Sequence, residues 1–380
     1  MHFEINDDQR MLVDMVRDFA DNELKAQAAE IDQTERFPLE SIRKMSELGL
    51  MGINVPEEYG GSPMGAVALS LAITEVAKAC ASTAVTMSVT NMVAEAINAF
   101  GTEEQKRTFI PKVVSGEFPM GSFSLSEPGA GSDAAALRTK AVLDGDHWVL
   151  NGSKIFISHG AFCSVMVVWA RTSDDPGPKG ISAFLVEKDT PGLIVGKEEH
   201  KLGLRGSNTV ALAFEDCRIP KDNLLGELGG GFKIAMMALD GGRIGISSQC
   251  IGIGAAAIAE AASYAKVREQ FGKPLAKMQA IQWKLADMAT NLEAARLLTL
   301  QAAWRKQSGL KFSREASMAK LFAAENLQDI VREAVQIHGG YGYTKEYLVE
   351  RLMRDARVVT IYEGTSEVQR IVIARDLLAD

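Results

Sequence analysis

Two stretches near the C-terminus decide how this 380-residue chain is interpreted: residues 336–342 read QIHGGYG, and residues 361–367 read IYEGTSE. The first closes a long helical pattern with paired glycines, and the second leads into a last helix that we expect to begin at Ser366. A third stretch, residues 125–133, reads LSEPGAGSD and lies far upstream. The fold and the function are inferred from what surrounds these three stretches.

The hydrophobic period divides the chain into three parts. Apolar residues recur at helical spacing before about residue 115, with Asp7 or Asp8 as the expected N-cap of the first helix. Short β-branched and aromatic runs follow, separated by turn residues such as Asn151-Gly152. From Gly231 the helical period returns in long, alanine-rich segments. We therefore expect an α+β fold with an N-terminal α-helical domain (1–120), a small middle β-sandwich or barrel (121–228) and a C-terminal four-helix bundle (229–380).

Composition is typical of an ordinary globular protein. Hydrophobic residues make up 47% of the chain, and its length exceeds the usual size of one core, so two or three domains are expected. The net charge is −8 and no block of Lys and Arg stands out, which argues against nucleic acid as a partner. The cysteines lie at neither metal-ligand nor redox-pair spacing, and we expect buried, reduced thiols. They are Cys80, Cys163, Cys217 and Cys250.

Targeting signals are not evident. The N-terminal residues 1–8 are acidic and lack an apolar signal region. By inspection, no apolar run approaches the roughly 18 residues of a membrane span. We expect no membrane span, and a cytoplasmic protein or a processed form in the mitochondrial matrix.

Residues 129–134, GAGSDA, match the dinucleotide pattern G-x-G-x-x-A, but a Rossmann site is rejected. That fingerprint requires a preceding buried strand and a following long helix, whereas here Glu127-Pro128 intervenes and strands follow. Two interpretations remain from the residues alone. The stretch is either a tight turn or a loop whose amides and hydroxyls contact a cofactor.

Taken together, the segments at 125–133, 336–342 and 361–367 resemble the signatures of the acyl-CoA dehydrogenase family, and the resemblance covers the whole chain. Residues 239–244 and 177–182 are similar to the short-chain branch of butyryl- and isobutyryl-CoA dehydrogenases. The resemblance implies a homotetrameric FAD flavoprotein, a dimer of dimers, that acts in β-oxidation. It would convert an acyl-CoA into the 2-enoyl-CoA and pass electrons to electron-transfer flavoprotein.

Two alternatives were weighed against this function. An acyl-CoA oxidase using oxygen is disfavoured because oxidases of this superfamily are usually longer. A non-catalytic flavoprotein homologue that serves binding or assembly would be expected to lose the base or acquire a basic surface, and Glu363 and the negative net charge argue against it.

The resemblance also implies the cofactor site. Phe156 and Ser158 replace the tryptophan and threonine that cover the flavin in many relatives, and Ser132 contacts flavin phosphate or substrate. Arg268, Phe271 and the 336–340 bend would complete the flavin site of a neighbouring subunit, whereas His338 is expected to be a packing residue. The implied cofactor-binding residues are Leu125, Ser126, Gly131, Ser132, Phe156, Ser158, Arg268, Phe271, Gln336, Gly339, Gly340, Thr365 and Glu367.

By the same resemblance, Glu363 is the catalytic base that removes the α-proton, and its backbone N–H helps to bind the thioester oxygen. Some branches carry the base immediately before Arg243, where this chain has Gly242. Ala84 stands where glutaryl-CoA dehydrogenases place an arginine, so we expect a short straight, branched or alicyclic acyl group and not a dicarboxylate. The implied substrate-binding residues are Ser132, Asp240, Arg243, Tyr362 and Gly364.

Overall fold

The chain begins with a layer of helices. A computed structural model describes residues 5–379. The N-cap of the first helix is Asn6, not Asp7 or Asp8: its side chain accepts the Gln9 N–H at 2.8 Å, and the Gln9 side chain accepts the Asn6 N–H in return. Asp7 and Asp8 lie in the first turn, where their negative charges interact favourably with the positive end of the helix dipole. The N-terminal helices are α1 (Asp7–Phe19), α2 (Lys25–Thr34), α3 (Leu39–Glu47), α4 (Ala66–Ala79), α5 (Ala81–Phe100) and α6 (Glu103–Ser115).

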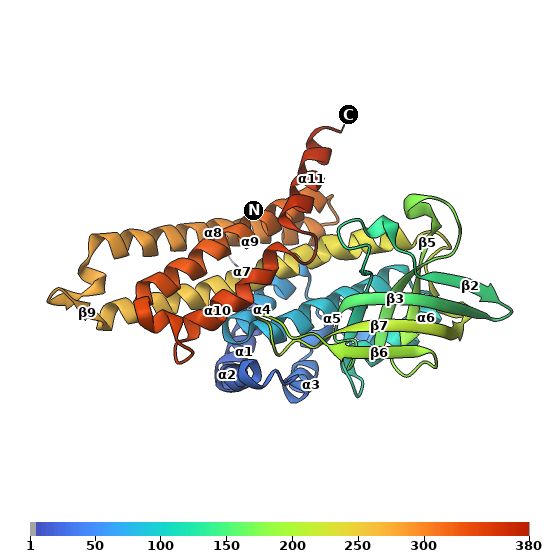
Figure 1. Ribbon diagram of the computed structural model, residues 1–380, viewed down its shortest axis with the longest axis horizontal. Helices are drawn as coiled ribbons and strands as arrows, with labels where there is room; N and C mark the ends of the chain where they lie inside the picture. Colours follow the sequence, from blue (N-terminus) through green and yellow to red (C-terminus); the bar gives the residue numbers. More distant parts are fainter. Residues whose placement is uncertain (1–4, 380) are drawn as a thin grey trace.

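The middle of the chain forms one eight-stranded sheet, drawn in green to yellow in Figure 1. Its strands follow the order β6-β7-β3-β2-β4-β5-β8, and β1 pairs in parallel with β4. Strands β4 and β5 are buried along almost their whole length, since helices of both other parts pack near them. The strands are β1 (Gly121–Ser124), β2 (Lys140–Asp144), β3 (His147–Ser158), β4 (Val165–Arg171), β5 (Ile181–Glu187), β6 (Leu193–Glu198), β7 (Thr209–Pro220) and β8 (Leu224–Leu225).

The turn predicted at Asn151-Gly152 is wrong. Strand β3 continues through these residues and stays paired with β7 over both halves. The pairing shifts between Leu150 and Gly152 and again between Lys154 and Ile157, so two β-bulges replace the turn. Glycine is required at position 152 because another segment of the backbone passes close to it, and not because the chain reverses there. A Cβ at Gly152 would lie 2.6 Å from Thr139 Oγ1.

The C-terminal part is a bundle of long helices, drawn in yellow to red in Figure 1. Helix α8 begins at Gln279, because a 3-10 turn over Leu275–Lys277 follows Pro274. A two-stranded hairpin of β9 (Glu269–Gln270) and β10 (Lys273–Pro274) joins the first two helices. The helices are α7 (Gly231–Val267), α8 (Gln279–Gln307), α9 (Ser313–His338), α10 (Leu348–Ala356) and α11 (Ser366–Leu377).

Helix α7 corrects the statement that no apolar run approaches the length of a membrane span. Its most apolar window of 18 residues has a mean hydropathy of 1.3, enough by length and composition to cross a bilayer. However, 72% of that window is buried within the fold, where α7 packs against α4, α5, α8 and α9. Apolar residues all around a helix are also what a central core helix requires.

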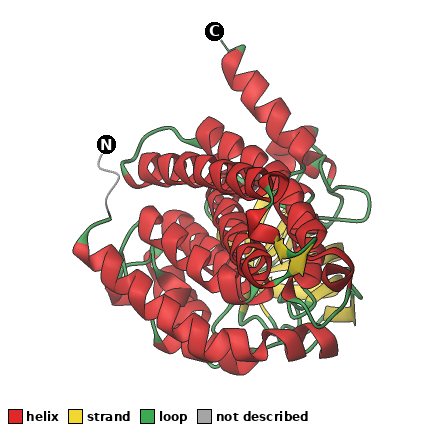
Figure 2. Ribbon diagram, turned by 90° about the vertical axis from the view of Figure 1, so that its left-hand side faces the viewer, coloured by secondary structure: helices red, strands yellow, loops and turns green. Residues whose placement is uncertain are grey.

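The predicted buried thiols are confirmed. All four cysteines are free and buried. In contrast, helix α11 leaves the body of the molecule, as Figure 2 shows, and its buried side chains are Ser366 and Gln369 in the first turn. The start of α11 is therefore anchored in the fold, and this anchor lies next to Glu363.

Candidate active site

Glu363 lies in a short left-handed turn between a 3-10 turn over Arg357–Thr360 and helix α11. Glu363 has φ +55° and Gly364 has φ +85°. A residue with a side chain rarely adopts such a conformation, and it persists where surrounding contacts impose it. Gln369 Nε2 donates to the carbonyls of Glu363 and Gly364 at 3.2 and 2.8 Å, and Lys320 Nζ donates to the Gly364 carbonyl at 2.8 Å. Buried side chains thus hold both carbonyls of the turn.

The carboxylate of Glu363 points at Gly242 on α7. A Cβ added to Gly242 would lie 2.7 Å from Glu363 Oε2 and 2.9 Å from the sulfur of Met92, so a side chain there would displace the carboxylate. Oε2 is buried and has no hydrogen-bond partner among the described residues. Burial raises the pKa of Glu363 to about 7, against the opposing effects of Arg243 and then Lys320. The group therefore has the basicity that proton abstraction near neutral pH requires.

Arg243 and Asp240 form an ion pair on α7, in which Arg243 is buried and Asp240 is half-buried. The Arg243 side chain is 5% exposed, and its Nη1 donates to Asp240 Oδ1 at 2.6 Å and to Ser317 Oγ at 3.2 Å. Burial raises the pKa of Asp240, although the charge of Arg243 opposes this. The Nε of Arg243 is left buried without a partner in the described structure. Such a cation beside Glu363 is suited to orient a polar ligand.

Tyr362 and the first residues of α11 complete the surroundings of Glu363. The Tyr362 hydroxyl donates to Gln249 Oε1, and burial raises its pKa well above 10, so the phenol stays neutral. Thr365 caps α11 by accepting the Val368 N–H at 3.3 Å, and Glu367 lies exposed in the first turn. Among the described residues, four buried polar atoms near this turn lack partners, which marks a site for a polar ligand. These atoms are Arg243 Nε, Glu363 Oε2, Ser366 Oγ and Gln369 Oε1.

The glycine-rich loop is both a tight turn and an exposed loop. Glu127 and Ala130 exchange backbone hydrogen bonds of 3.1 and 3.0 Å, while Gly131 and Ser132 are exposed. A buried ion pair holds its base: Lys154 Nζ lies 2.8 Å from Glu127 Oε1 and also donates to the Leu125 carbonyl at 3.1 Å. Burial lowers the pKa of Lys154 to about 8, and the partner carboxylate opposes this. This clamp presents the outer residues of the loop to solvent.

Strand β3 presents Phe156 beside this loop. The Ile155 N–H donates to the Ser126 carbonyl at 3.0 Å, which places the strand against the loop. Phe156 has φ +57° in the second bulge and is 65% exposed, so its ring does not pack in the core. Leu125, in contrast, is buried beneath the loop in the hydrophobic core. An exposed aromatic ring next to hydroxyls fits a planar cofactor with polar edges, such as a flavin.

The remaining predicted cofactor residues lie at the opposite end of the molecule. Phe271 is 93% exposed at the tip of the β9–β10 hairpin, and the Arg268 guanidinium lies 5.5 Å from the centre of the Tyr341 ring. Figure 1 shows β9 at the end of the bundle farthest from the sheet. The exposed Gln336, Gly339 and Gly340 belong to the same end as Tyr341. One chain therefore does not bring these residues to Phe156.

His338 behaves as the sequence predicts for a packing residue. It is buried, its Nδ1 lies 2.8 Å from the Ala334 carbonyl, and its ring stacks on Tyr264 at 4.3 Å.

Sequence reasoning missed several residues that shape the site: Lys320, Gln369, Gln249, Met92 and the Lys154–Glu127 pair. A signal existed for Lys320. It lies at helical spacing from Ala316 and Ala323, and therefore on the buried face of α9. The others are recognised only once the elements are packed together.

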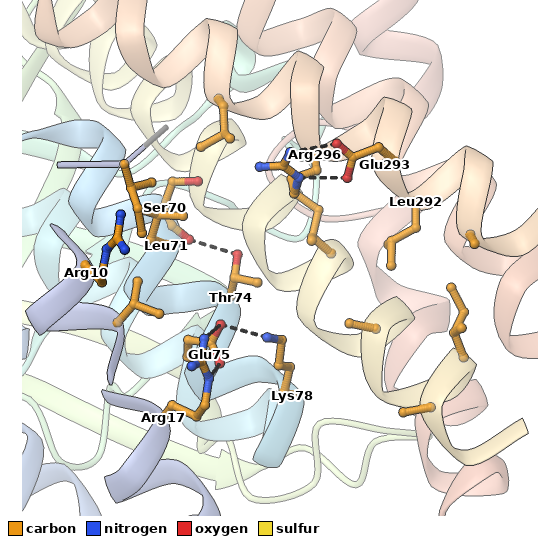
Figure 3. A pocket seen from close by; sticks show the side chains of 18 residues that line it. Arg10, Arg17, Ser70, Leu71, Thr74, Glu75, Lys78, Leu292, Glu293 and Arg296 are labelled. Carbon is orange, nitrogen blue, oxygen red and sulfur yellow. Dashed lines mark hydrogen bonds and ion pairs between the residues drawn. The ribbon is translucent and has the colours of Figure 1, made fainter. Parts of the chain in front are cut away.

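A cavity of about 760 Å³ opens elsewhere, between α1, α4, α7 and α8, and Figure 3 shows its lining. Its charged side chains are largely paired with one another, as in Arg17 with Glu75 and Arg296 with Glu293. It includes none of the predicted site residues, so the catalytic site is assigned by the chemistry around Glu363 and not by this cavity.

Family models match nearly the whole chain. They describe the acyl-CoA dehydrogenase N-terminal domain at residues 6–117, the middle domain at 122–217 and the C-terminal domain at 229–378. The chain belongs to the acyl-CoA dehydrogenase family. It is therefore an oxidoreductase that acts on the CH–CH group of an acyl-CoA with FAD as cofactor, and the predicted fold class is confirmed.

Individual proteins are similar to this chain over nearly its full length. The chain is 53% identical to the bovine mitochondrial short-chain specific acyl-CoA dehydrogenase, over 99% of this chain and 91% of that protein. It is 48% identical to an acryloyl-CoA reductase (NADH) of Anaerotignum propionicum, over 100% and 96%. Butyryl-CoA dehydrogenase from Megasphaera elsdenii is 44% identical, with a TM-score of 0.98 and full coverage of both chains. A chain in a structure describing the electron transferring flavoprotein of Acidaminococcus fermentans is 47% identical, with a TM-score of 0.98 and full coverage of both.

The raised pKa of Glu363 predicts a pH-dependent stability effect. Because the folded state holds this proton up to about pH 7 and an ordinary carboxyl releases it near 4.5, stability is lost as pH rises through that window. Replacing Glu363 with Gln should raise the midpoint of thermal unfolding more above pH 7 than near pH 4.5. Calorimetry of both proteins across this range measures it, with Glu104→Gln on the exposed face of α6 as control. An equal effect at both ends would contradict a buried, proton-binding carboxylate.

Proposed function

We propose that this chain oxidises a short-chain acyl-CoA to the 2-enoyl-CoA, with Glu363 as the base and electron-transfer flavoprotein as the electron acceptor. The observation that carries the proposal is the buried, unpartnered carboxylate oxygen of Glu363, which faces the open surface of Gly242. An α-hydrogen of a thioester is weakly acidic, so its removal needs a positioned base of near-neutral pKa and donors for the developing oxyanion.

The turn provides one such donor. Among the described residues, the backbone N–H of Glu363 has no hydrogen-bond partner, whereas the carbonyls of Glu363 and Gly364 both accept hydrogen bonds. That N–H and the carboxylate belong to the same residue, so a thioester could meet the oxyanion donor and the base together. Arg243 and Asp240 supply charge beside the same position.

Residues from two ends of the fold would hold FAD. Phe156, Ser158, Ser126, Gly131 and Ser132 would contact it from the sheet of one chain. When bound, FAD supplies the acceptor for the hydride that leaves the β-carbon. The protein residues bind and orient the acyl group, exclude water and receive the α-proton at the Glu363 carboxylate. By family resemblance, Thr365 and Glu367 would contact the same cofactor. The predicted flavin residues at the far end of the bundle would contact it from a second chain; they are Arg268, Phe271, Gln336, Gly339 and Gly340.

The same geometry serves either direction of the reaction, because a base that takes the α-proton also returns it. Similarity to both a short-chain dehydrogenase and an acryloyl-CoA reductase is in keeping with a small acyl group. We favour an enzyme over a non-catalytic homologue, since the base is present in a buried, activated setting. We favour the dehydrogenase over an oxygen-using oxidase, since the chain is similar to a short-chain specific acyl-CoA dehydrogenase over 91% of that protein. Similarity to a chain in an electron transferring flavoprotein structure supports that partner.

The proposed function first predicts the effect of removing the catalytic base, Glu363. Glu363→Gln should still bind FAD and acyl-CoA, but flavin reduction should slow by at least about 100-fold, because the α-proton has no acceptor. Anaerobic stopped-flow at the flavin absorption band measures this rate. Glu104→Gln, on the exposed face of α6, is the control for the same chemical change away from the site. A Glu363→Gln rate within a few-fold of wild type would sink the assignment.

A relocated base tests the same geometry. A glutamate at 242 combined with Glu363→Gln would overlap the new amide, because a Cβ at Gly242 lies 2.7 Å from the position of Oε2. Glu363→Gly with Gly242→Glu removes this overlap, and part of the flavin reduction should return. Glu363→Gly alone, which should stay inactive, is the control.

Assembly is the subject of another prediction. We propose a homotetramer, a dimer of dimers, because the residues beside β9, Arg268 and Phe271, lie at the end of the bundle opposite the sheet that carries Phe156. Gln336 lies near the C-terminal end of α9, which leads into Tyr341 beside Arg268. Arg268→Ala should leave the fold intact but weaken FAD retention, and FAD loss should accompany dissociation. Light scattering with flavin absorbance measures both. A monomer that holds FAD in a one-to-one ratio would contradict this arrangement.

The last prediction here concerns substrate size. Ala84 is fully buried in α5, and no described cation replaces the arginine of glutaryl-CoA dehydrogenases at that position, so a buried distal carboxylate would be unpaired there. Acyl groups of about four to six carbons, straight, branched or cyclic, should show the highest kcat/KM. Each added or removed methylene should change the free energy of transition-state binding by about 1–3 kcal/mol. A steady-state panel with an artificial acceptor measures this. Higher kcat/KM for palmitoyl-CoA or glutaryl-CoA would overturn the proposed specificity.

A further inference from the structure

Lys320 is a fully buried lysine in the middle of α9. Its neighbours on the buried face of this helix are mainly alanines, among them Ala316, Ala319, Ala323 and Ala324. A lysine is rarely found without solvent unless its ammonium group has a partner. The helix face that carries Lys320 packs toward α7 and α11, so its side chain ends behind the turn that carries Glu363.

The partner of this ammonium group is the backbone of the catalytic turn. Lys320 Nζ donates to the Gly364 carbonyl at 2.8 Å, and Gln369 Nε2 donates to the same oxygen at 2.8 Å. The peptide between Gly364 and Thr365 is thereby held from two sides, and Gln369 Nε2 also holds the Glu363 carbonyl at 3.2 Å. Since Glu363 and Gly364 both have positive φ, a turn released from these bonds would relax and carry the carboxylate away from Gly242.

We propose that Lys320 is a positioning residue for Glu363: by bonding the Gly364 carbonyl it keeps the carboxylate of Glu363 directed at Gly242, and its charge favours the ionised form of that carboxylate. This inference rests on the proposed role of Glu363 as the base. Lys320 contacts neither reacting carbon. It acts through the turn, and its removal should lower the rate of proton transfer more than the affinity for acyl-CoA.

The charged groups around the pair support the electrostatic part. Glu363 faces two cations, Arg243 from α7 and Lys320 from α9. The thiol of Cys250 is kept neutral near pH 7, because burial raises its pKa to about 12. Burial lowers the pKa of Lys320 to about 8, so it is still mainly protonated near neutral pH. Titratable and charged groups face Lys320 from several elements: Cys250 and Arg243 from α7, Glu325 from α9, Glu367 from α11, and Glu363 from the turn before α11.

Two substitutions separate the two effects. Lys320→Met keeps the length of the side chain but removes the donor and the charge. Lys320→Gln keeps an N–H donor and removes the charge alone. Lys112→Met, on α6 and paired with Glu187 at the surface, is the matched control for the chemical change and should behave as wild type.

Flavin reduction by butyryl-CoA, under anaerobic conditions and across pH, is the measurement on FAD-loaded protein. For Lys320→Met we expect a rate lower by roughly 10- to 100-fold with little change in the Kd of butyryl-CoA. Its acid limb should move to higher pH by roughly one unit, because a cation near the base is lost. Lys320→Gln should show the same movement of the acid limb but recover most of the rate at high pH.

The result that overturns the inference is a wild-type rate and pH profile in Lys320→Met, or a loss of rate matched by an equal loss of butyryl-CoA affinity with no movement of the acid limb. If Lys320→Met does not retain FAD, Lys320→Gln and Lys320→Arg decide: the charge-keeping Arg variant must hold the wild-type pH profile and the Gln variant must not. Glu363→Gln in the same series separates the two proposals. If it reduces flavin at the wild-type rate, the base is misassigned; if it is inactive while the Lys320 variants match wild type, the positioning role alone is wrong.

Discussion

Desolvation of one carboxylate is the constraint on which the site depends. Glu363 is held out of water against α7, and this environment raises its pKa to about 7. A buried charge of this kind is costly, so the fold has to limit the cost and fix the geometry at once. Arg243 and Lys320 limit it by supplying two cations from different helices, while the absence of a side chain at Gly242 leaves the carboxylate its room.

The backbone around Glu363 is as constrained as its side chain. A left-handed glutamate followed by a left-handed glycine would relax to other conformations in an isolated peptide. Here Gln369, anchored in the first turn of α11, and Lys320 bond the carbonyls of the turn. Burial at the start of α11 therefore serves the site, which explains why this helix is held at its first turn although the rest leaves the body of the molecule.

The sheet uses a related device where the flavin-binding strand is predicted. Bulges in β3 bring Phe156 out to solvent with a positive φ, and the Lys154–Glu127 pair fixes the neighbouring loop from beneath. In the turn at Glu363 and in the loop beside Phe156, buried polar groups hold a few exposed or reactive atoms in place. The second set of predicted flavin residues, around Arg268 and Phe271, is exposed at the far end of the bundle, so a complete site requires a second chain under the assembly proposed above.

The amino-acid sequence by itself determined the order of helices, strands and helices. Its resemblance to the acyl-CoA dehydrogenase family singled out Glu363 as the candidate base and Gly242 as the position where other branches carry theirs. Periodicity reports which face of an element is buried, and short motifs report local turn chemistry, so both are readable along the chain. Only the tertiary structure decided that Asn151-Gly152 is a bulge, that Arg243 is buried and that Lys320 and Gln369 grip the turn. These facts depend on atoms contributed by elements far apart in sequence: Lys320 and Gly364 are 44 positions apart and meet only because α9 packs beneath α11.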